Sequence, residues 1–277
     1  MGPISADGGV KGLTSEQIET LRDLRSVWPN SRLVLIGASA LACLVEMNWR
    51  QTHDLDLSAS ISQAEFPGSL IGRTGWVPVR SREHSWLSPH GVRVDIIPAG
   101  SKELAAGSIV WPTTGAMMNL AGFRLVFERA VPIQLTPDLS VEAAPLEVIA
   151  LLKMVAYLAR PQERTRDLEY LSHLLEDFVM PFSAERFSSE LLEMAMNYEL
   201  VSAYLLGAKL AAIVDESERA LVEAFVSKAM NEDDPDQTQA RMVRAWPWRG
   251  QSSILLSRIA AFQQGFSSKS DHEPRRG

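Results

Sequence analysis

The sequence has a single cysteine among its 277 residues. One thiol excludes an internal disulfide framework and is typical of proteins kept in a reducing compartment, so we expect a cytoplasmic location. Cys43 falls in an apolar helical pattern. We therefore expect a buried, inert thiol there rather than a nucleophile.

Long apolar runs are also missing. The longest, Leu33 to Val45, is interrupted by Gly37 and Ser39, and it is shorter than the roughly 20 residues that a helix needs to span a bilayer. The glycine-rich N-terminus has no basic stretch leading into an apolar core, so no export signal is expected. The sequence predicts no membrane association.

Basic charge is scarce overall, since 27 lysines and arginines face 34 acidic residues and the formal net charge is −7. This balance argues against a protein coated in basic surface for nonspecific nucleic-acid binding, although it leaves room for a local basic patch. With one cysteine and no histidines at zinc-ligand spacings, a zinc site is not expected either.

The N-terminal half mixes helical and strand patterns. A capping sequence at Thr14 predicts a helix that ends near Pro29, and a short apolar strand ends at Gly37 before a small-residue helix. The expected strands are residues 32–36, 53–58, 75–79, 83–88, 91–97, 131–135 and 139–141, and the small-residue helix covers 38–47.

The composition changes at Pro145, after which helical periodicity dominates. The expected helices are residues 146–158, 162–177, 184–196, 201–213, 216–230 and 252–264, with a loop at 231–237. The sequence therefore predicts an α+β fold with a small mixed sheet flanked by helices, followed by an all-helical C-terminal domain. The expected boundaries are a flexible N-terminus at 1–14, an α/β domain at 15–141, a helical domain at 145–265 and a disordered tail at 266–277.

Gly37-Ala38-Ser39 lies between a buried strand and a helix. The glycine permits a tight turn, and the N–H groups at a helix N-terminus suit a triphosphate. The alternative is an ordinary structural turn in which Ser39 caps the helix.

Asp54 and Asp56 alternate with leucines and therefore project from one face of a strand. Two carboxylates held so close repel each other unless a cation neutralises them, and Mg²⁺ prefers carboxylate oxygens. The alternative is a solvent-facing strand that carries two acids.

Asp95 is a lone acid between Val94 and Ile96 in an apolar strand. A buried carboxylate needs a partner. If this strand lies beside the Asp54–Asp56 strand, the three carboxylates form a cluster that can hold two divalent ions for nucleotidyl transfer. Arg93 shares the face of Asp95, so the alternative is a salt bridge.

These motifs together resemble the DNA polymerase β-type nucleotidyltransferase superfamily, and within it most closely the abortive-infection nucleotidyltransferase toxins (AbiEii-like). The similar segments, spread over residues 33–175, are Gly37-Ala-Ser39, Arg50-x-Thr52-x-Asp54-Leu-Asp56-Leu, Val92-x-Val94-Asp95-Ile-Ile, Lys153-Met-Val-Ala-Tyr157 and Arg164-Thr-Arg166-Asp167-Leu168. Ala38 departs from the family pattern, which has a second glycine or a serine there.

The resemblance implies a nucleotidyltransferase fold and the transfer of an NMP from an NTP to an RNA 3′ end, such as that of a tRNA, or to a protein side chain. It implies two Mg²⁺ or Mn²⁺ ions as cofactors and a toxin–antitoxin or phage-defence setting with an antitoxin partner. Asp54, Asp56 and Asp95 would be catalytic metal ligands, Asp95 also the base, and the nucleotide-binding residues would be Gly37, Ala38, Ser39, Lys153, Arg166 and Asp167.

Three alternatives stay open on the sequence. For the function, the alternatives are a catalytically inactive nucleotide-binding or interaction protein on the same fold and a structural α/β protein whose acids lie on the surface. Lys153 lies either on the solvated edge of an amphipathic helix or on a phosphate. Trp246-Pro-Trp248-Arg249 stacks on a base or packs within the protein.

Overall fold

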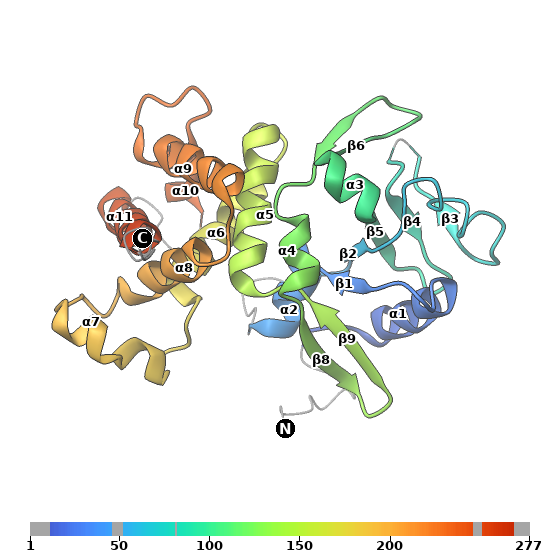
Figure 1. The fold of residues 1–277 in the computed structure, drawn as a ribbon, viewed down its shortest axis with the longest axis horizontal. Coiled ribbons are helices and arrows are strands. Elements are labelled where there is room, and N and C mark those ends of the chain that lie inside the picture. The colour runs from blue at the N-terminus through green and yellow to red at the C-terminus, as the bar shows by residue number, and fades with distance from the viewer. Residues whose placement is uncertain (1–11, 46–51, 81, 246–250, 269–277) are drawn as a thin grey trace, which may run out of the picture. The chain divides into compact units, whose positions relative to one another are not determined.

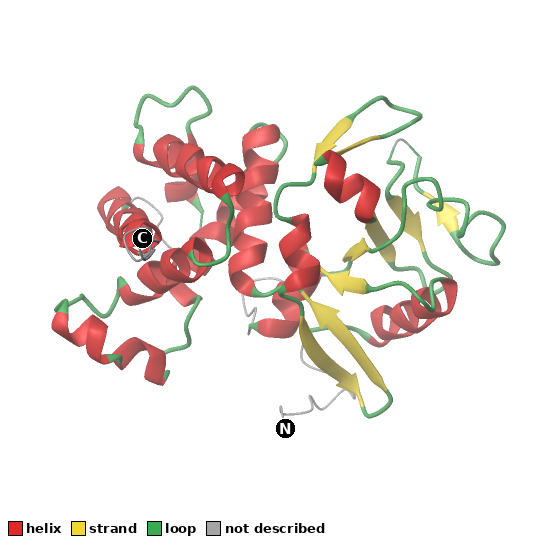
Figure 2. Ribbon diagram, in the orientation of Figure 1, coloured by secondary structure: helices red, strands yellow, loops and turns green. Residues whose placement is uncertain are grey.

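The computed structural model describes residues 12–45, 52–80, 82–245 and 251–268. It has a mixed sheet flanked by helices, which confirms the predicted α+β class (Figure 2). The chain divides into two compact units, residues 1–149 and residues 150–277. No helix of the described ranges combines the length and the apolar character that crossing a membrane requires.

The first unit is built on a seven-stranded sheet with the order β3-β4-β5-β2-β1-β9-β8 (Figure 1). β2 runs parallel to β5 and β1 parallel to β9, while the other neighbours are antiparallel. A separate two-stranded sheet joins β6 and β7. The strands are β1 Leu33–Leu35, β2 Leu55–Ala59, β3 Val77–Pro78, β4 Ser85–Leu87, β5 Arg93–Pro98, β6 Ser108–Val110, β7 Met117–Asn119, β8 Val131–Thr136 and β9 Leu139–Ala143.

The first unit also contains α1 Ser15–Val27, α2 Gly37–Leu44, α3 Ser101–Ala106 and α4 Phe123–Glu128. The predicted cap of α1 is confirmed: the Gln17 N–H donates to the Thr14 hydroxyl, and the Thr14 N–H donates to the Gln17 side chain. β4 and β5 fall within the expected strands at 83–88 and 91–97 and form a hairpin, with Gly91 at φ 76° in its turn. Local sequence chemistry thus set both features.

Alternation along the strands separates an apolar face from a carboxylate face. Leu55 and Leu57 in β2 and Val94 and Ile96 in β5 are at most 1% exposed. The aspartates between them point to the opposite face, because neighbouring residues of a strand project to opposite sides. The core of the first unit therefore holds the carboxylate-bearing strands in register.

The second unit is helical in the residues described. Its helices are α6 Thr165–Asp177, η1 Ala184–Phe187, α7 Ser189–Glu193, α8 Val201–Ala211, α9 Glu216–Met230, α10 Thr238–Arg244 and α11 Ser252–Ser268, together with the part of α5 Leu146–Ala159 that follows Ile149.

Helices α8 and α11 contact each other at two glycines, Gly207 and Gly265. A Cβ added to Gly207 would lie 2.1 Å from the carbonyl oxygen of Phe262, and one added to Gly265 would lie 2.0 Å from that of Tyr204. The two backbones therefore approach each other more closely than any side chain allows.

The helix expected at 184–196 is wrong as a single element. It is divided into η1 and α7 because Ser188 between them is extended, at φ −61° and ψ 150°. The tail expected from Phe266 onward is also partly wrong, since α11 continues to Ser268 and Phe266 is 3% exposed and stacks on Phe262. Short elements without a strong period were not predicted at all: α3, β6, β7, α4 and α10.

Candidate active site

Asp56 and Asp95 lie opposite each other on the parallel strands β2 and β5. Neighbouring strands are about 4.8 Å apart, and residues opposite each other point to the same face. The condition that these two strands are neighbours, which the sequence left open, is met. Their two carboxylates, each half-buried, therefore share one face of the sheet.

The Gly37 turn packs directly against Asp56. Gly37 begins α2 with φ 57°, and a Cβ added to it would lie 2.5 Å from Asp56 Oδ2. The next residue, Ala38, donates its N–H to the same oxygen at 3.1 Å. The N-terminus of α2 thus binds a carboxylate of the chain itself, which fixes the position of the Asp56 side chain.

Ser39 joins the turn to β2. Its side chain is completely buried, and its hydroxyl lies 3.0 Å from the carbonyl oxygen of Ile36 and 3.1 Å from that of Asp56. It also accepts the Asp56 N–H at 3.1 Å. These contacts give Ser39 a structural part in the turn, and its predicted contact with phosphate stays a prediction.

Arg93 lies between the acids. Its Nη2 is 2.5 Å from Asp54 Oδ2, and its Nε is 3.8 Å from Asp95 Oδ1. The salt bridge that the sequence left open as an alternative is therefore present. Gln17, which also caps α1, donates from its side-chain amide to the carbonyl oxygens of Thr52 and Asp54 at 3.2 and 3.3 Å and positions the chain as it enters β2.

Ser85 is a site residue that the sequence analysis missed. It pairs with Asp95 across the antiparallel strands β4 and β5, and its fully buried hydroxyl donates a short hydrogen bond to Asp95 Oδ1. Counting outward from the Pro89-His90-Gly91 turn would have placed it there, because the turn sets the register of a hairpin.

The chemistry of this face suits a hard divalent cation, since its donors are carboxylate oxygens. Within the described ranges, no three His, Cys, Asp or Glu side chains stand in metal-binding geometry. The ion pair with Arg93 directs Asp54 to the guanidinium. Asp56 and Asp95 are therefore the two carboxylates that the sheet places together, whereas Asp54 is engaged by Arg93.

Lys153 and Asp167 belong to the second unit, where they bind each other. Lys153 Nζ is 3.0 Å from Asp167 Oδ1 and 3.8 Å from the centre of the Tyr170 ring. Lys153 is only 6% exposed, so a place on a solvated helix edge is wrong. Arg166 is exposed at the start of α6. A contact of these residues with a nucleotide stays a prediction.

Two sequence motifs lie outside the described residues. These are Arg50 of the segment before the Asp54–Asp56 strand and the whole of Trp246-Pro-Trp248-Arg249. Thr52 is described, and its hydroxyl donates to the Asp54 carbonyl oxygen at 3.2 Å.

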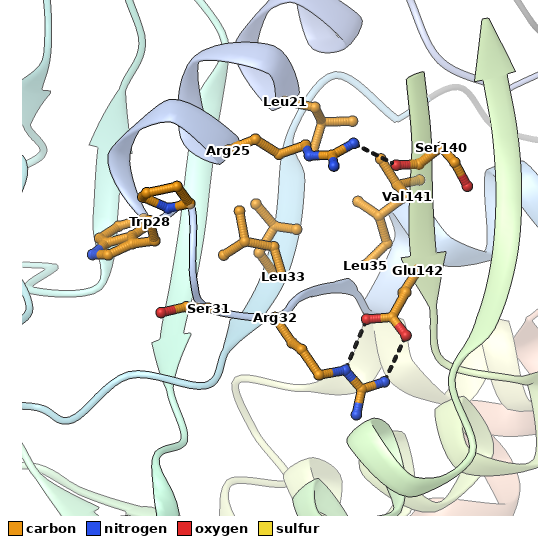
Figure 3. Close-up of a pocket in the computed structure, with 12 residues that line it drawn as sticks. Leu21, Arg25, Trp28, Ser31, Arg32, Leu33, Leu35, Ser140, Val141 and Glu142 are labelled. Carbon is orange, nitrogen blue, oxygen red and sulfur yellow. Dashed lines mark hydrogen bonds and ion pairs between the residues drawn. The ribbon is translucent and has the colours of Figure 1, made fainter. Parts of the chain in front are cut away.

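A cavity of about 210 Å³ lies in the first unit between α1, β1 and β9 (Figure 3). Leu35 and Leu57 form part of its wall, and they are register partners on β1 and β2. Because Asp56 neighbours Leu57 in β2, its side chain points to the other face of the sheet. This cavity is therefore separate from the carboxylates.

Cys43 in α2 is half-buried rather than fully buried as expected, although the expected low reactivity agrees with its pKa. Burial raises the pKa of its thiol to about 12. A thiol with so little thiolate is a poor nucleophile and a poor metal ligand.

No protein-family model matches this chain, and the search of curated proteins found no match.

Proposed function

We propose that this chain is a metal-dependent nucleotidyltransferase that transfers an NMP from an NTP to an acceptor hydroxyl. The observation that carries the proposal is the pairing of Asp56 with Asp95 across β2 and β5. The Gly37 turn against Asp56 adds to it, because a glycine at φ 57° is needed for that close approach.

Asp56 and Asp95 would hold Mg²⁺ or Mn²⁺, with Asp54 joining them when it leaves Arg93. The bound ions would neutralise charge on the phosphates and on the attacking and leaving oxygens. Nucleotide binding by the Gly37-Ala38 turn belongs to the same proposal, and the contacts of Lys153, Arg166 and Asp167 with a nucleotide stay predictions.

A side chain of the protein would then accept the proton of the acceptor hydroxyl. The acceptor oxygen forms a bond to the α-phosphorus, and the bond from that phosphorus to the bridging oxygen breaks, so that pyrophosphate leaves. Asp95 takes the hydroxyl proton as general base. The hydrogen bond from Ser85 holds the Asp95 carboxylate in one orientation.

The resemblance to AbiEii-like proteins supports an RNA 3′ end or a protein side chain as the acceptor and a toxin–antitoxin or phage-defence setting. The acidic net charge of −7 favours a protein acceptor, or an RNA held by a basic partner.

The test is label transfer from each α-labelled NTP, with Mg²⁺ or Mn²⁺ and with cellular RNA or protein as acceptor. Asp56→Asn should abolish transfer and leave the thermal melt intact. Asp233→Asn, a change of an exposed aspartate in the loop after α9, should behave as the parent does. Equal labelling by the Asp56→Asn protein would overturn the proposal.

A nucleotide-binding protein without transfer activity is a second candidate, and the ion pair of Arg93 with Asp54 favours it because one acid is already neutralised. Isothermal titration separates the two. A Mg²⁺-dependent NTP complex combined with no transfer to any acceptor supports the binding protein.

A further inference from the structure

Exposed apolar side chains gather in one segment of the second unit, between α6 and α8. Phe182 is 89% exposed and Leu192 is 66% exposed, values unusual for side chains of that size. We call the set the 180–198 surface, and its members are Met180, Phe182, Phe187, Leu192, Met194 and Tyr198. In Figure 1, η1 and α7 extend outward from the other helices of this unit.

The aromatic members lie together. The rings of Phe187 and Tyr198 are 5.9 Å apart, and the Tyr198 hydroxyl accepts the Phe182 N–H at 3.4 Å. Phe182 precedes η1 and Phe187 is its last residue, whereas Tyr198 precedes α8. Residues from the two ends of the segment therefore lie next to each other.

A buried arginine holds the two ends of this segment together. Arg186 is 6% exposed and donates to the carbonyl oxygens of Val179, Met180 and Tyr198 at 2.9, 3.2 and 3.3 Å. These bonds tie the start of the segment to its end. A surface that is ordered beforehand loses less conformational entropy when a partner binds.

The backbone at Phe182 also costs free energy. Its φ is 65°, a left-handed conformation that costs a bulky residue about 1 kcal/mol. Burial of the ring does not offset that cost, because the ring is almost fully exposed. A binding partner that covers Phe182 would supply the missing burial.

The rim of the surface is acidic. Residues 180–199 contain four glutamates and one arginine, a net charge of −3, and that arginine is the buried Arg186. Glu193 and Glu199 are exposed, and Glu185 pairs with Lys209 at 2.6 Å. Such a rim is repelled by anionic lipid and attracts a basic partner.

We propose that the 180–198 surface binds a basic amphipathic helix of a partner protein. Apolar side chains of that helix, spaced three and four residues apart, would pack on the phenylalanines and methionines of this surface. Methionine side chains adapt to irregular shapes. Its lysines and arginines would lie near Glu193 and Glu199.

The full chain is tested with a synthetic leucine–lysine peptide of about four helical turns, patterned so that the leucines share one face. Two peptides serve as comparison: one with glutamate in place of lysine, and one of the same composition with shuffled spacing. Fluorescence anisotropy should show binding of the patterned leucine–lysine peptide alone. Its affinity should fall with rising salt.

Phe182→Asn together with Leu192→Ser should weaken this binding at least tenfold, a loss of about 1.4 kcal/mol. Asparagine tolerates the left-handed backbone, so the fold should survive. Ile71→Ser together with Met117→Ser changes side chains that are 65% and 68% exposed elsewhere and should leave binding unchanged. Glu193→Gln together with Glu199→Gln should weaken binding and reduce its salt dependence.

Four outcomes would overturn the proposal. The Phe182→Asn/Leu192→Ser protein binds as the parent does, or either comparison peptide binds equally well. The surface binds phosphatidylserine vesicles, which would make its occupant a lipid. Sedimentation shows self-association that the same double variant abolishes, which would make the occupant a second copy of the chain.

Discussion

At the scale of single residues, the candidate site depends on the absence of a side chain at Gly37. Asp56 occupies the space that a Cβ on Gly37 would need. Its carboxylate is then fixed by the N–H of Ala38. Because Gly37 has no Cβ, the carboxylate of Asp56, a proposed metal ligand, can lie against it.

Gly37→Ala should reduce nucleotidyl transfer at least tenfold, about 1.4 kcal/mol in the barrier, because the new methyl group displaces Asp56. Gly72→Ala is the matched control, since Gly72 has φ 80° with nothing within 4 Å of its added Cβ. Both variants carry the same backbone cost, of about 1 kcal/mol in the free energy of unfolding. Equal transfer rates in the two proteins would show that the clash at Asp56 is irrelevant to activity.

The buried pair of Lys153 and Asp167 gives a second residue-scale prediction. Lys153→Met should lower the free energy of unfolding by about 3 kcal/mol, because Asp167 is left as an unpaired buried charge. Lys153→Met combined with Asp167→Leu should recover most of that loss, to within about 1 kcal/mol of the parent. Urea titrations measure both. If the double variant is stable yet inactive, the pair also serves the proposed reaction; a double variant less stable than the single one contradicts the argument.

At the scale of elements, strongly periodic segments could be predicted from the sequence and short ones could not. The strands β2 and β5 and the capped α1 follow from alternation and capping, whereas the pairing of β2 with β5 does not follow from alternation. Helices of six or seven residues, such as α3 and α10, carry too few turns to show a period. A salt bridge of Arg93 near Asp95 was an open alternative, but its closer partner, Asp54, could not be predicted because side-chain direction on a strand does not fix the partner.

The contact of α8 with α11 yields a prediction at this scale. Alanine normally stabilises a helix over glycine by about 1 kcal/mol. Gly207→Ala should instead destabilise the chain by about 2 kcal/mol or more, because its Cβ would lie 2.1 Å from the Phe262 carbonyl oxygen and push the helices apart. Gln263→Ala, an exposed change on α11, is the control. A Gly207→Ala protein with a raised midpoint in urea would refute the close packing.

At the scale of the whole molecule, one buried histidine contributes to the dependence of stability on pH. Loss of hydration lowers the pKa of His173 to about 4 from 6.5, although Glu176 acts in the opposite direction. Between those two values the unfolded chain binds a proton that the folded chain does not. The free energy of unfolding therefore falls as the pH falls from 6.5 to about 4. The stability that the neutral His173 side chain gives the folded state is fully present only above pH 6.5.

His173→Leu should remove that dependence, which is worth at most about 3 kcal/mol across the interval. Urea midpoints measured at several pH values between neutral and mildly acidic conditions provide the comparison. His53→Leu changes an exposed histidine in the first unit and serves as the control. A slope that is unchanged in the His173→Leu protein would assign the acid sensitivity to other groups.

The single thiol of α2 has a practical consequence for measuring all of this. With a pKa of about 12, Cys43 is ionised in only about one molecule in 10⁵ at neutral pH. Maleimide dyes react with thiolates, so the native chain stays almost unlabelled. A fluorophore placed through Leu192→Cys would then report selectively from the 180–198 surface, and the native cysteine need not be replaced.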